Sequence, residues 1–201
     1  MDTPLCKLFK EYGADKHPDY RHSYSAEYYN ILSPFQKDFK NILEVGVGTP
    51  ELMQRYLPSS KVYKPGASLR AWRDFFSNAH IYGIDIEKEV LFQEDRINCF
   101  YTDQSSSSEL KKTLEEICKH SKNPSLKYDF ILDDGSHVIE HMLVTFQTLK
   151  EHLTTGGVYI IEDIKREDLD IFKNLADDTY QLHYVYDGKD DWDSFVAYIK
   201  K

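Results

Sequence analysis

Residues 41–48 read Asn-Ile-Leu-Glu-Val-Gly-Val-Gly, a short apolar run that ends in two glycines one residue apart. Comparable apolar runs occur at 81–85, 97–101, 128–132 and 158–161. Helical patterns lie between them, at 69–76, 109–119 and 139–153. Apolar strands that lack polar alternation and are separated by helices predict an α/β fold, with a doubly wound, mostly parallel sheet covered on both faces.

Both ends of the chain depart from this alternation. Residues 180–186 and 194–199 form two strand-like runs joined by the turn-rich segment 187–191, which leaves no room for a helix and predicts an antiparallel hairpin. At the other end, Thr3 and Gly13 can begin and end a short helix, and a second helix is expected near 25–32. The tyrosines of that second helix either cover a cleft or pack in the core.

The composition excludes several classes of protein. The 201 residues include 34 acidic and 25 basic side chains, a net charge of -9, which is not the basic footprint of a nucleic-acid binder. A hydrophobic content of 41% is too high for a disordered chain, and no apolar run approaches the roughly 20 residues that span a bilayer. The first residues do not resemble a secretory signal, and three cysteines without a CxxC pair suit a reducing cytosol, so we expect a cytoplasmic protein.

The residues that follow the predicted strands are unusually acidic. They are Glu44, Asp85, Asp103 with Gln104, Asp133 with Asp134, and Glu162 with Asp163. Ligands of open parallel sheets bind at this edge, where Gly46 and Gly48 permit close backbone approach and Asp85 can bind two ribose hydroxyls. These features are shared by folds that bind NAD and folds that bind S-adenosylmethionine. Glu51 stands where the third glycine of the dinucleotide fingerprint is expected, which disfavours NAD.

Carboxylates at the ends of two neighbouring strands also predict a cation site. Asp134, Glu162 and Asp163 can converge on one hard divalent cation, although some of them can instead cap helices. Beside them His137 is a candidate general base, with capping or packing as the alternative. Residues 137–141 also match the H-x-x-E-H pattern of zinc peptidases, but that interpretation leaves the acidic strand ends without a role.

Several segments together resemble the class I S-adenosylmethionine-dependent methyltransferases, and within them the metal-dependent sugar O-methyltransferases of the macrocin and mycinamicin type. The matching segments are Tyr-Gly-Ala-Asp-Lys at 12–16, Leu-Glu-Val-Gly-Val-Gly at 43–48, Gly-Ala-Ser-Leu-Arg-Ala-Trp at 66–72, Gly-Ile-Asp-Ile at 83–86, Asp-Gln at 103–104, Asp-Asp-Gly-Ser-His at 133–137 and Gly-Gly-Val-Tyr-Ile-Ile-Glu-Asp at 156–163. Ala14 stands where such proteins usually carry threonine.

The resemblance implies a Rossmann-like methyltransferase fold with seven strands in the order 3-2-1-4-5-7-6. It implies that S-adenosylmethionine is bound by Glu44, Gly46, Ser68, Asp85, Asp103, Gln104 and Asp133. It also implies that Mg²⁺ is bound by Asp134, Glu162 and Asp163, with His137 as the general base. We expect one domain over 1–201, in which a helical segment 1–40 forms a lid on a catalytic core at 41–201.

The expected function is therefore a magnesium-dependent O-methyl transfer to a sugar hydroxyl of a nucleotide sugar, glycan or glycosylated metabolite, without nucleic-acid or membrane partners. The sequence leaves the acceptor and the oligomeric state open, a homo-oligomer included. Three alternatives remain: a metal-dependent methyltransferase of catechol-like or other vicinal diols, a nicotinamide-dependent oxidoreductase, and a non-enzymatic nucleotide- or S-adenosylmethionine-binding protein.

Overall fold

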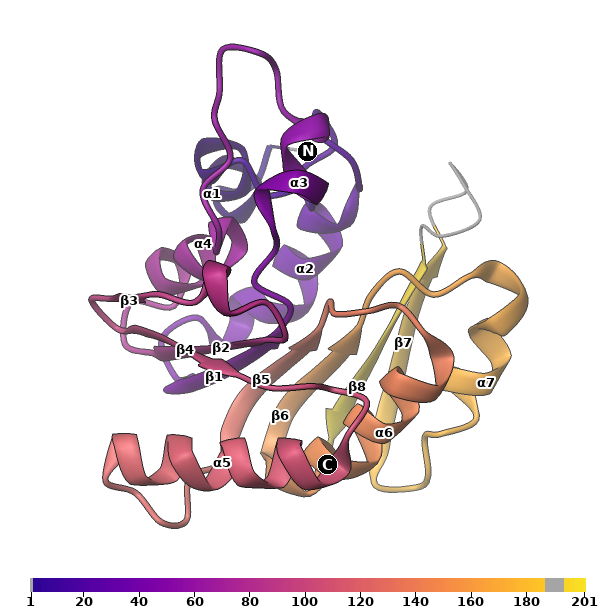
Figure 1. Ribbon diagram of the computed structural model, residues 1–201. Helices are drawn as coiled ribbons and strands as arrows, with labels where there is room; N and C mark the ends of the chain where they lie inside the picture. The colour runs from indigo at the N-terminus through magenta and orange to yellow at the C-terminus, as the bar shows by residue number, and fades with distance from the viewer. Residues whose placement is uncertain (1, 187–193) are drawn as a thin grey trace.

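A computed structural model describes residues 2–186 and 194–201, which fold into a central sheet with helices on both faces (Figure 1). The strands are β1 (Asn41–Val45), β2 (His80–Asp85), β3 (Gln93–Glu94), β4 (Ile97–Tyr101), β5 (Tyr128–Asp133), β6 (Leu153–Ile161), β7 (Tyr180–Tyr186) and β8 (Ser194–Lys200). The helices are α1 (Pro4–Tyr12), α2 (Tyr24–Leu32), α3 (Pro50–Met53), α4 (Ala67–Phe75), α5 (Ser107–Ser121), α6 (Ile139–Leu149) and α7 (Leu169–Lys173).

The described strands form one sheet in the order β3-β4-β2-β1-β5-β6-β8-β7. Strands β4, β2, β1, β5 and β6 are parallel, and the antiparallel hairpin of β7 and β8 adds to β6 through β8. The predicted order is confirmed once β3 is set aside. Strand β3 is the additional strand: it has two residues and pairs antiparallel with β4 at the edge of the sheet. It is too short and too polar to be recognised as an apolar run in the sequence.

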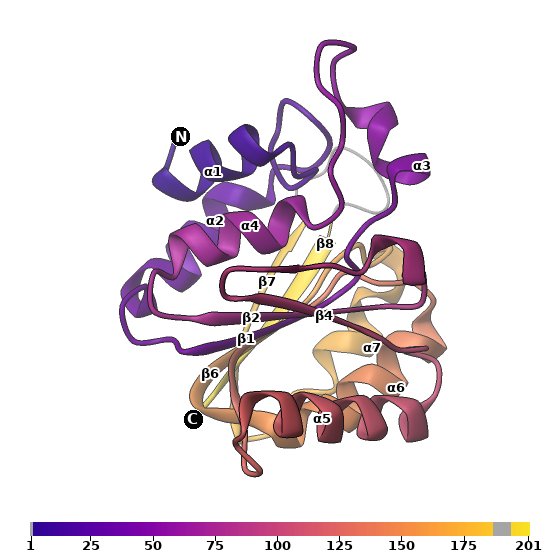
Figure 2. The same cartoon turned by 60° about the vertical axis from the view of Figure 1, so that its left-hand side comes forward.

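The two faces of the sheet carry separate hydrophobic clusters. Helices α1, α2 and α4 cover one face and α5, α6 and α7 the other, as Figure 2 shows from the side. Successive residues of a buried strand belong to different clusters. Phe130 of β5 packs in the cluster that contains α4, whereas Ile131 packs in the cluster that contains α5 and α6. Both strand faces are therefore buried, which explains why the strands read as continuous apolar runs.

Two local predictions differ from the structure, and a third lies outside the described residues. The helix predicted over 69–76 is α4, which begins at Ala67 with Gly66 as its N-cap, so Ser68 lies in its first turn and donates a hydrogen bond to Glu44. Helix α6 ends at Leu149, and Leu153 begins β6, which is longer than predicted because its first half continues across Gly156. The predicted turn at 187–191 lies outside the described residues.

None of the helices in the described residues is both long and apolar enough to cross a bilayer.

The aromatic core beneath α4 centres on Trp72. Its ring is fully buried and lies edge-on to Phe9 of α1 at 4.9 Å and to Phe130 of β5 at 5.2 Å between centroids. One side chain thus connects the amino-terminal helix, α4 and the sheet.

We expect Trp72→Ala to lower the free energy of unfolding by about 3–5 kcal/mol, because it leaves a cavity at this junction. Val62→Ala is the control, since Val62 is 86% exposed and should change stability by less than about 0.5 kcal/mol. Urea denaturation measures both variants, and equal losses would contradict this account of the core.

The end of β1 lies directly against the loop that follows β5. Gly46 has a φ of +95°, and a Cβ atom there would lie 2.0 Å from the carbonyl oxygen of Asp134. The backbone N–H of Asp134 in turn donates to the carbonyl of Val45 at 2.9 Å. This approach therefore requires glycine for its backbone conformation and for its lack of a side chain.

Gly46→Ala and Gly156→Ala form a matched pair. Gly156 also has a positive φ, +77°, but a Cβ atom there meets nothing within 4 Å. Both variants should carry the roughly 1–2 kcal/mol of left-handed strain, and Gly46→Ala should lose about 2 kcal/mol more because of the clash. Denaturant titration measures the difference, and similar losses would contradict the close approach at Gly46.

Candidate active site

A cavity of about 880 Å³ opens at the carboxyl edge of the sheet, where β1, β2, β4 and β5 end. Its lining includes seven of the predicted site residues, which are Gly46, Ser68, Asp85, Asp103, Gln104, Asp134 and His137. The remaining four, Glu44, Asp133, Glu162 and Asp163, do not line it. Of these four, Glu44, Asp133 and Glu162 are at most 1% exposed, whereas the Asp163 side chain is 14% exposed.

Asp85 is fixed at the end of β2 by backbone hydrogen bonds. Its Oδ2 accepts from the N–H of Val47 at 2.7 Å, and its Oδ1 accepts from the N–H of Glu87 at 2.8 Å. The carboxylate therefore joins the glycine turn after β1 to the end of β2 and holds a defined orientation at the cavity. This is a suitable position for binding neighbouring hydroxyls of a ribose.

Glu44 is a fully buried carboxyl group on β1. Ser68 donates a 2.6 Å hydrogen bond to its Oε1, while Oε2 finds no hydrogen-bond partner among the described residues. Burial raises the pKa of Glu44 to about 8, although the charge of Lys16 acts in the opposite direction.

Asp133 is the second buried carboxyl group beneath the cavity. Gln104 donates to its Oδ1 at 3.2 Å and accepts from the N–H of Ser136 at 2.6 Å, which ties the loop after β4 to the loop after β5. Burial raises the pKa of Asp133 to about 7, and its Oδ2 has no hydrogen-bond partner in the described part of the chain. By contrast, Asp103 has a lowered pKa because Ser105 donates hydrogen bonds to it.

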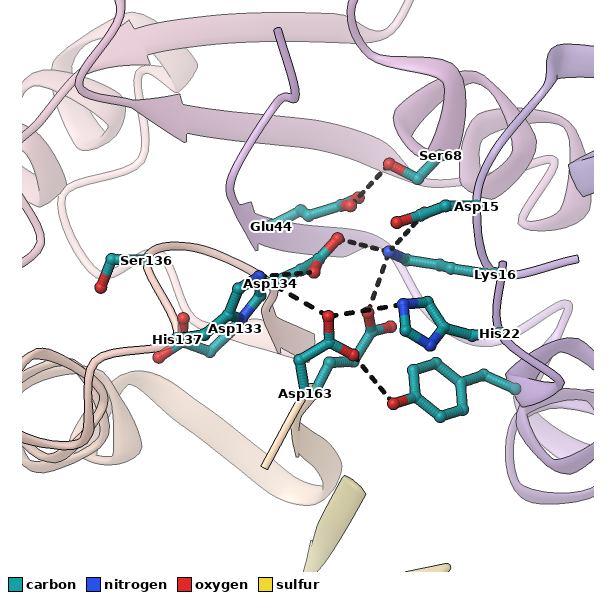
Figure 3. Close-up of polar contacts among 12 residues, drawn as sticks. Asp15, Lys16, His22, Glu44, Ser68, Asp133, Asp134, Ser136, His137 and Asp163 are labelled. Atoms are coloured by element: carbon teal, nitrogen blue, oxygen red, sulfur yellow. Dashed lines mark hydrogen bonds and ion pairs between the residues drawn. The ribbon is translucent and has the colours of Figure 1, made fainter. Parts of the chain in front are cut away.

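Asp134, His137 and Asp163 offer ligand atoms that all lie within 4.8 Å of one another. His137 Nε2 lies 3.9 Å from Asp134 Oδ1 and 3.6 Å from Asp163 Oδ2 (Figure 3). His137 and Asp163 also have left-handed backbones, with φ of +55° and +51°. Such conformations cost energy in residues other than glycine and are concentrated at functional sites.

Glu162 lies deeper than this trio. Its Oε1 accepts a hydrogen bond from the Tyr28 hydroxyl, and its Oε2 lies 3.0 Å from Lys16 Nζ. The structure thus groups His137 with Asp134 and Asp163 and places Glu162 in the core behind them. Burial raises the pKa of Glu162 well above its ordinary value, and the charge of Asp134 adds to the rise.

The segment before β1 supplies four side chains that the sequence did not single out for this site. Tyr24 donates to Asp163 Oδ1 at 2.8 Å, and His22 Nε2 lies 3.4 Å from Asp163 Oδ2. Burial would raise the pKa of Asp163, but the hydrogen bond from His22 and the proximity of His137 outweigh it and lower the pKa to about 2. Tyr24 and Tyr28 therefore pack in the core and also direct their hydroxyl groups at the carboxylates.

Lys16 is the fourth residue missed, and it is fully buried. Its Nζ lies 2.5 Å from Asp134 Oδ2, 3.0 Å from Glu162 Oε2 and 3.6 Å from Asp15 Oδ1. Burial would lower the pKa of Lys16, but Asp134 and Glu162 hold it well above its ordinary value. The sequence contained a signal for such a residue, because three converging carboxylates need positive charge nearby. Lys16 supplies part of that charge from within the chain.

The zinc-peptidase pattern at 137–141 receives no support from this geometry. The group of candidate ligand atoms found in residues 2–186 and 194–201 includes His137 but neither Glu140 nor His141. His141 Nδ1 lies 3.0 Å from Ser136 Oγ.

Comparison with curated proteins identifies sugar O-methyltransferases as relatives. The chain is 31% identical over 178 residues to the 8-demethyl-8-alpha-L-rhamnosyl tetracenomycin-C 2'-O-methyltransferase of Streptomyces olivaceus, covering 88% of this chain and 42% of that protein. It is 32% identical over 136 residues to the mycinamicin VI 2''-O-methyltransferase of Micromonospora griseorubida, covering 64% of this chain and 29% of that protein. The chain thus spans less than half the length of these relatives. No protein-family model matches it.

Solved structures agree with this relationship. The mycinamycin-pathway methyltransferase MycE, in complex with Mg and SAH, superimposes with a TM-score of 0.73 at 25% identity, over 98% of this chain and 55% of MycE. An O-methyltransferase from Bacillus cereus, at 15% identity and a TM-score of 0.58 over 92% of its length, shares the fold. The predicted resemblance is confirmed: the chain has the Rossmann-like methyltransferase fold, and its sequence homologues are the macrocin-, mycinamicin- and tetracenomycin-type sugar O-methyltransferases.

Proposed function

We propose that this chain transfers the methyl group of S-adenosylmethionine to a sugar hydroxyl, with Mg²⁺ bound beside the acceptor. The observation that carries the proposal is one cavity edge on which a glycine turn and Asp85 adjoin Asp134 and His137. The named activities and ligands of the sugar O-methyltransferase relatives and of MycE support it.

The residues present fit the methyl donor. Gly46 of the glycine turn lines the cavity, and Asp85 is oriented to accept hydrogen bonds from ribose hydroxyls. Two buried carboxyl oxygens, on Glu44 and Asp133, lack partners among the described residues and suit a positively charged ligand above them. We assign Gly46, Ser68, Asp103 and Gln104 to the same site because they line its cavity.

The residues also fit magnesium, which prefers carboxylate oxygens. Asp134 and Asp163 would hold the ion, and Glu162 would complete the set from behind them, as the sequence predicts. When bound, the ion orients two neighbouring hydroxyls of the acceptor and lowers the pKa of one of them.

His137 is the proposed general base. Its Nε2 faces Asp134 and Asp163, so a hydroxyl held beside those carboxylates lies within its reach. The acceptor oxygen forms a bond to the methyl carbon while the carbon–sulfur bond breaks. Nε2 takes the hydroxyl proton, and S-adenosylhomocysteine leaves with a neutral sulfur.

We also propose that residues 1–201 act as one methyltransferase domain, in which 1–40 covers the core at 41–201. Lys16, His22, Tyr24 and Tyr28 support this division, because they reach from that segment to the carboxylates after β5 and β6. A glycoside is the proposed acceptor, as in the relatives named for such substrates.

Asp85→Ala tests the donor site. We expect it to weaken binding of S-adenosylhomocysteine by roughly 10–100-fold, because hydrogen bonds to a charged group are lost. Asp95→Ala is the control, since the Asp95 side chain is 89% exposed. Isothermal calorimetry measures both, with NAD as a parallel titrant. Binding of NAD in preference to S-adenosylhomocysteine would favour the oxidoreductase alternative and contradict the proposal.

His137→Ala tests the chemical step. We expect kcat for methyl transfer to fall by about 10²–10⁴-fold while S-adenosylhomocysteine binding changes little, because only the proton acceptor is removed. His80→Ala, at the exposed start of β2, should behave as wild type.

The assay uses a panel of glycosides that includes L-rhamnosides, with catechol as the competing acceptor class. Near-wild-type transfer by His137→Ala would contradict the base assignment, and methylation of catechol alone would replace the sugar acceptor. EDTA should abolish transfer and Mg²⁺ should restore it.

A further inference from the structure

An ammonium group lies among the carboxylates that the proposed function assigns to magnesium. Lys16 Nζ is within 3.0 Å of oxygens from two different strand ends, Asp134 after β5 and Glu162 after β6 (Figure 3). Its side chain is 1% exposed, and it enters from the segment between α1 and α2. The lysine is therefore a buried component of the cluster and not a surface ion pair.

The contacts of Lys16 divide the oxygens of Asp134. Oδ2 faces Lys16 at 2.5 Å, while Oδ1 faces His137 Nε2 at 3.9 Å. The Asp134 carboxylate therefore has one oxygen against Lys16 and the other toward His137.

Glu162 is held still more firmly on the core side. Lys16 and the Tyr28 hydroxyl contact its two oxygens separately. An ion that bridges Asp134 and Glu162 could take Asp134 Oδ1, which Lys16 does not contact, but at Glu162 it would need an oxygen that Lys16 or Tyr28 now contacts. Two cations that need the same ligand atoms compete for them, and each repels the other electrostatically.

We propose that Lys16 is a built-in cation of the magnesium site, a positioning residue that holds Asp134 and Glu162 together without metal, competes with the divalent ion for Glu162 and repels that ion electrostatically. The inference rests on the proposed function for the identity of the bound ion. The carboxylates are therefore already in place before the metal binds. Lys16 keeps their affinity for the metal ion low enough for the ion to exchange.

The test compares metal binding with metal-free stability. Lys16→Met replaces the ammonium group with an uncharged side chain of similar length. We expect Mn²⁺, followed by the electron paramagnetic resonance of the free ion, to bind about tenfold or more tightly, because a nearby positive charge is gone. The metal-free melting temperature should fall by about 10 °C, because buried carboxylates lose their partner, and saturating Mn²⁺ should recover most of that loss.

Three further variants separate charge from packing. Lys16→Arg keeps the charge and should keep the weaker Mn²⁺ affinity of the wild type. Lys64→Met removes an exposed lysine that pairs with Glu94 and should change neither measurement. Lys16→Gln keeps a hydrogen-bond donor and serves if Lys16→Met does not fold without metal, with the same expected gain in affinity.

Unchanged or weaker Mn²⁺ binding by Lys16→Met and Lys16→Gln would overturn the proposal, as would a gain of equal size in Lys16→Arg. Failure of the proposed function has a different signature: methyl transfer by the wild type that EDTA does not affect, or no binding of S-adenosylhomocysteine. The Mn²⁺ titrations of the variants still decide the role of Lys16 in that case.

Discussion

The rest of this structure depends on one constraint, the negative charge that collects at one edge of the parallel sheet. The strand ends bring Asp134, Glu162 and Asp163 together in a largely buried place, where carboxylates repel one another and lack water. The chain offsets this with one ammonium group, two tyrosine hydroxyls and two imidazoles. Each of the three carboxylates accepts from at least one of these groups, and Lys16 serves both Asp134 and Glu162.

This constraint also explains why the amino-terminal segment is part of the site. Lys16, His22, Tyr24 and Tyr28 come from residues before β1, yet their polar atoms meet residues after β5 and β6. The same segment packs its apolar side chains against α4 and the sheet, with Phe9 and Tyr28 both against Trp72. Hydrophobic burial places the segment, and the hydrogen bonds fix it at the carboxylates.

The sequence predicted what depends on local pattern and sheet topology. Apolar runs located the parallel strands and the hairpin, and strand-end positions placed Asp85, Asp134 and His137 at one cavity. It missed Lys16 and Tyr28, because a contact between the segment before β1 and strand ends over a hundred residues later leaves no periodic trace. It started the helix α4 at residue 69 rather than at Ala67, and it did not show that Ser68 bonds the buried carboxyl group of Glu44.

The carboxyl groups at the acidic edge of the sheet differ in the direction of their pKa shifts. Burial raises the pKa of Glu44 to about 8, whereas His22 and His137 help lower that of Asp163 to about 2. Burial therefore favours the protonated form of Glu44, while the neighbouring imidazoles favour the ionised form of Asp163. A cationic ligand bound beside Glu44 would favour its carboxylate form. On the proposed function, the methyl donor and the metal would therefore meet different carboxylates of the same sheet edge.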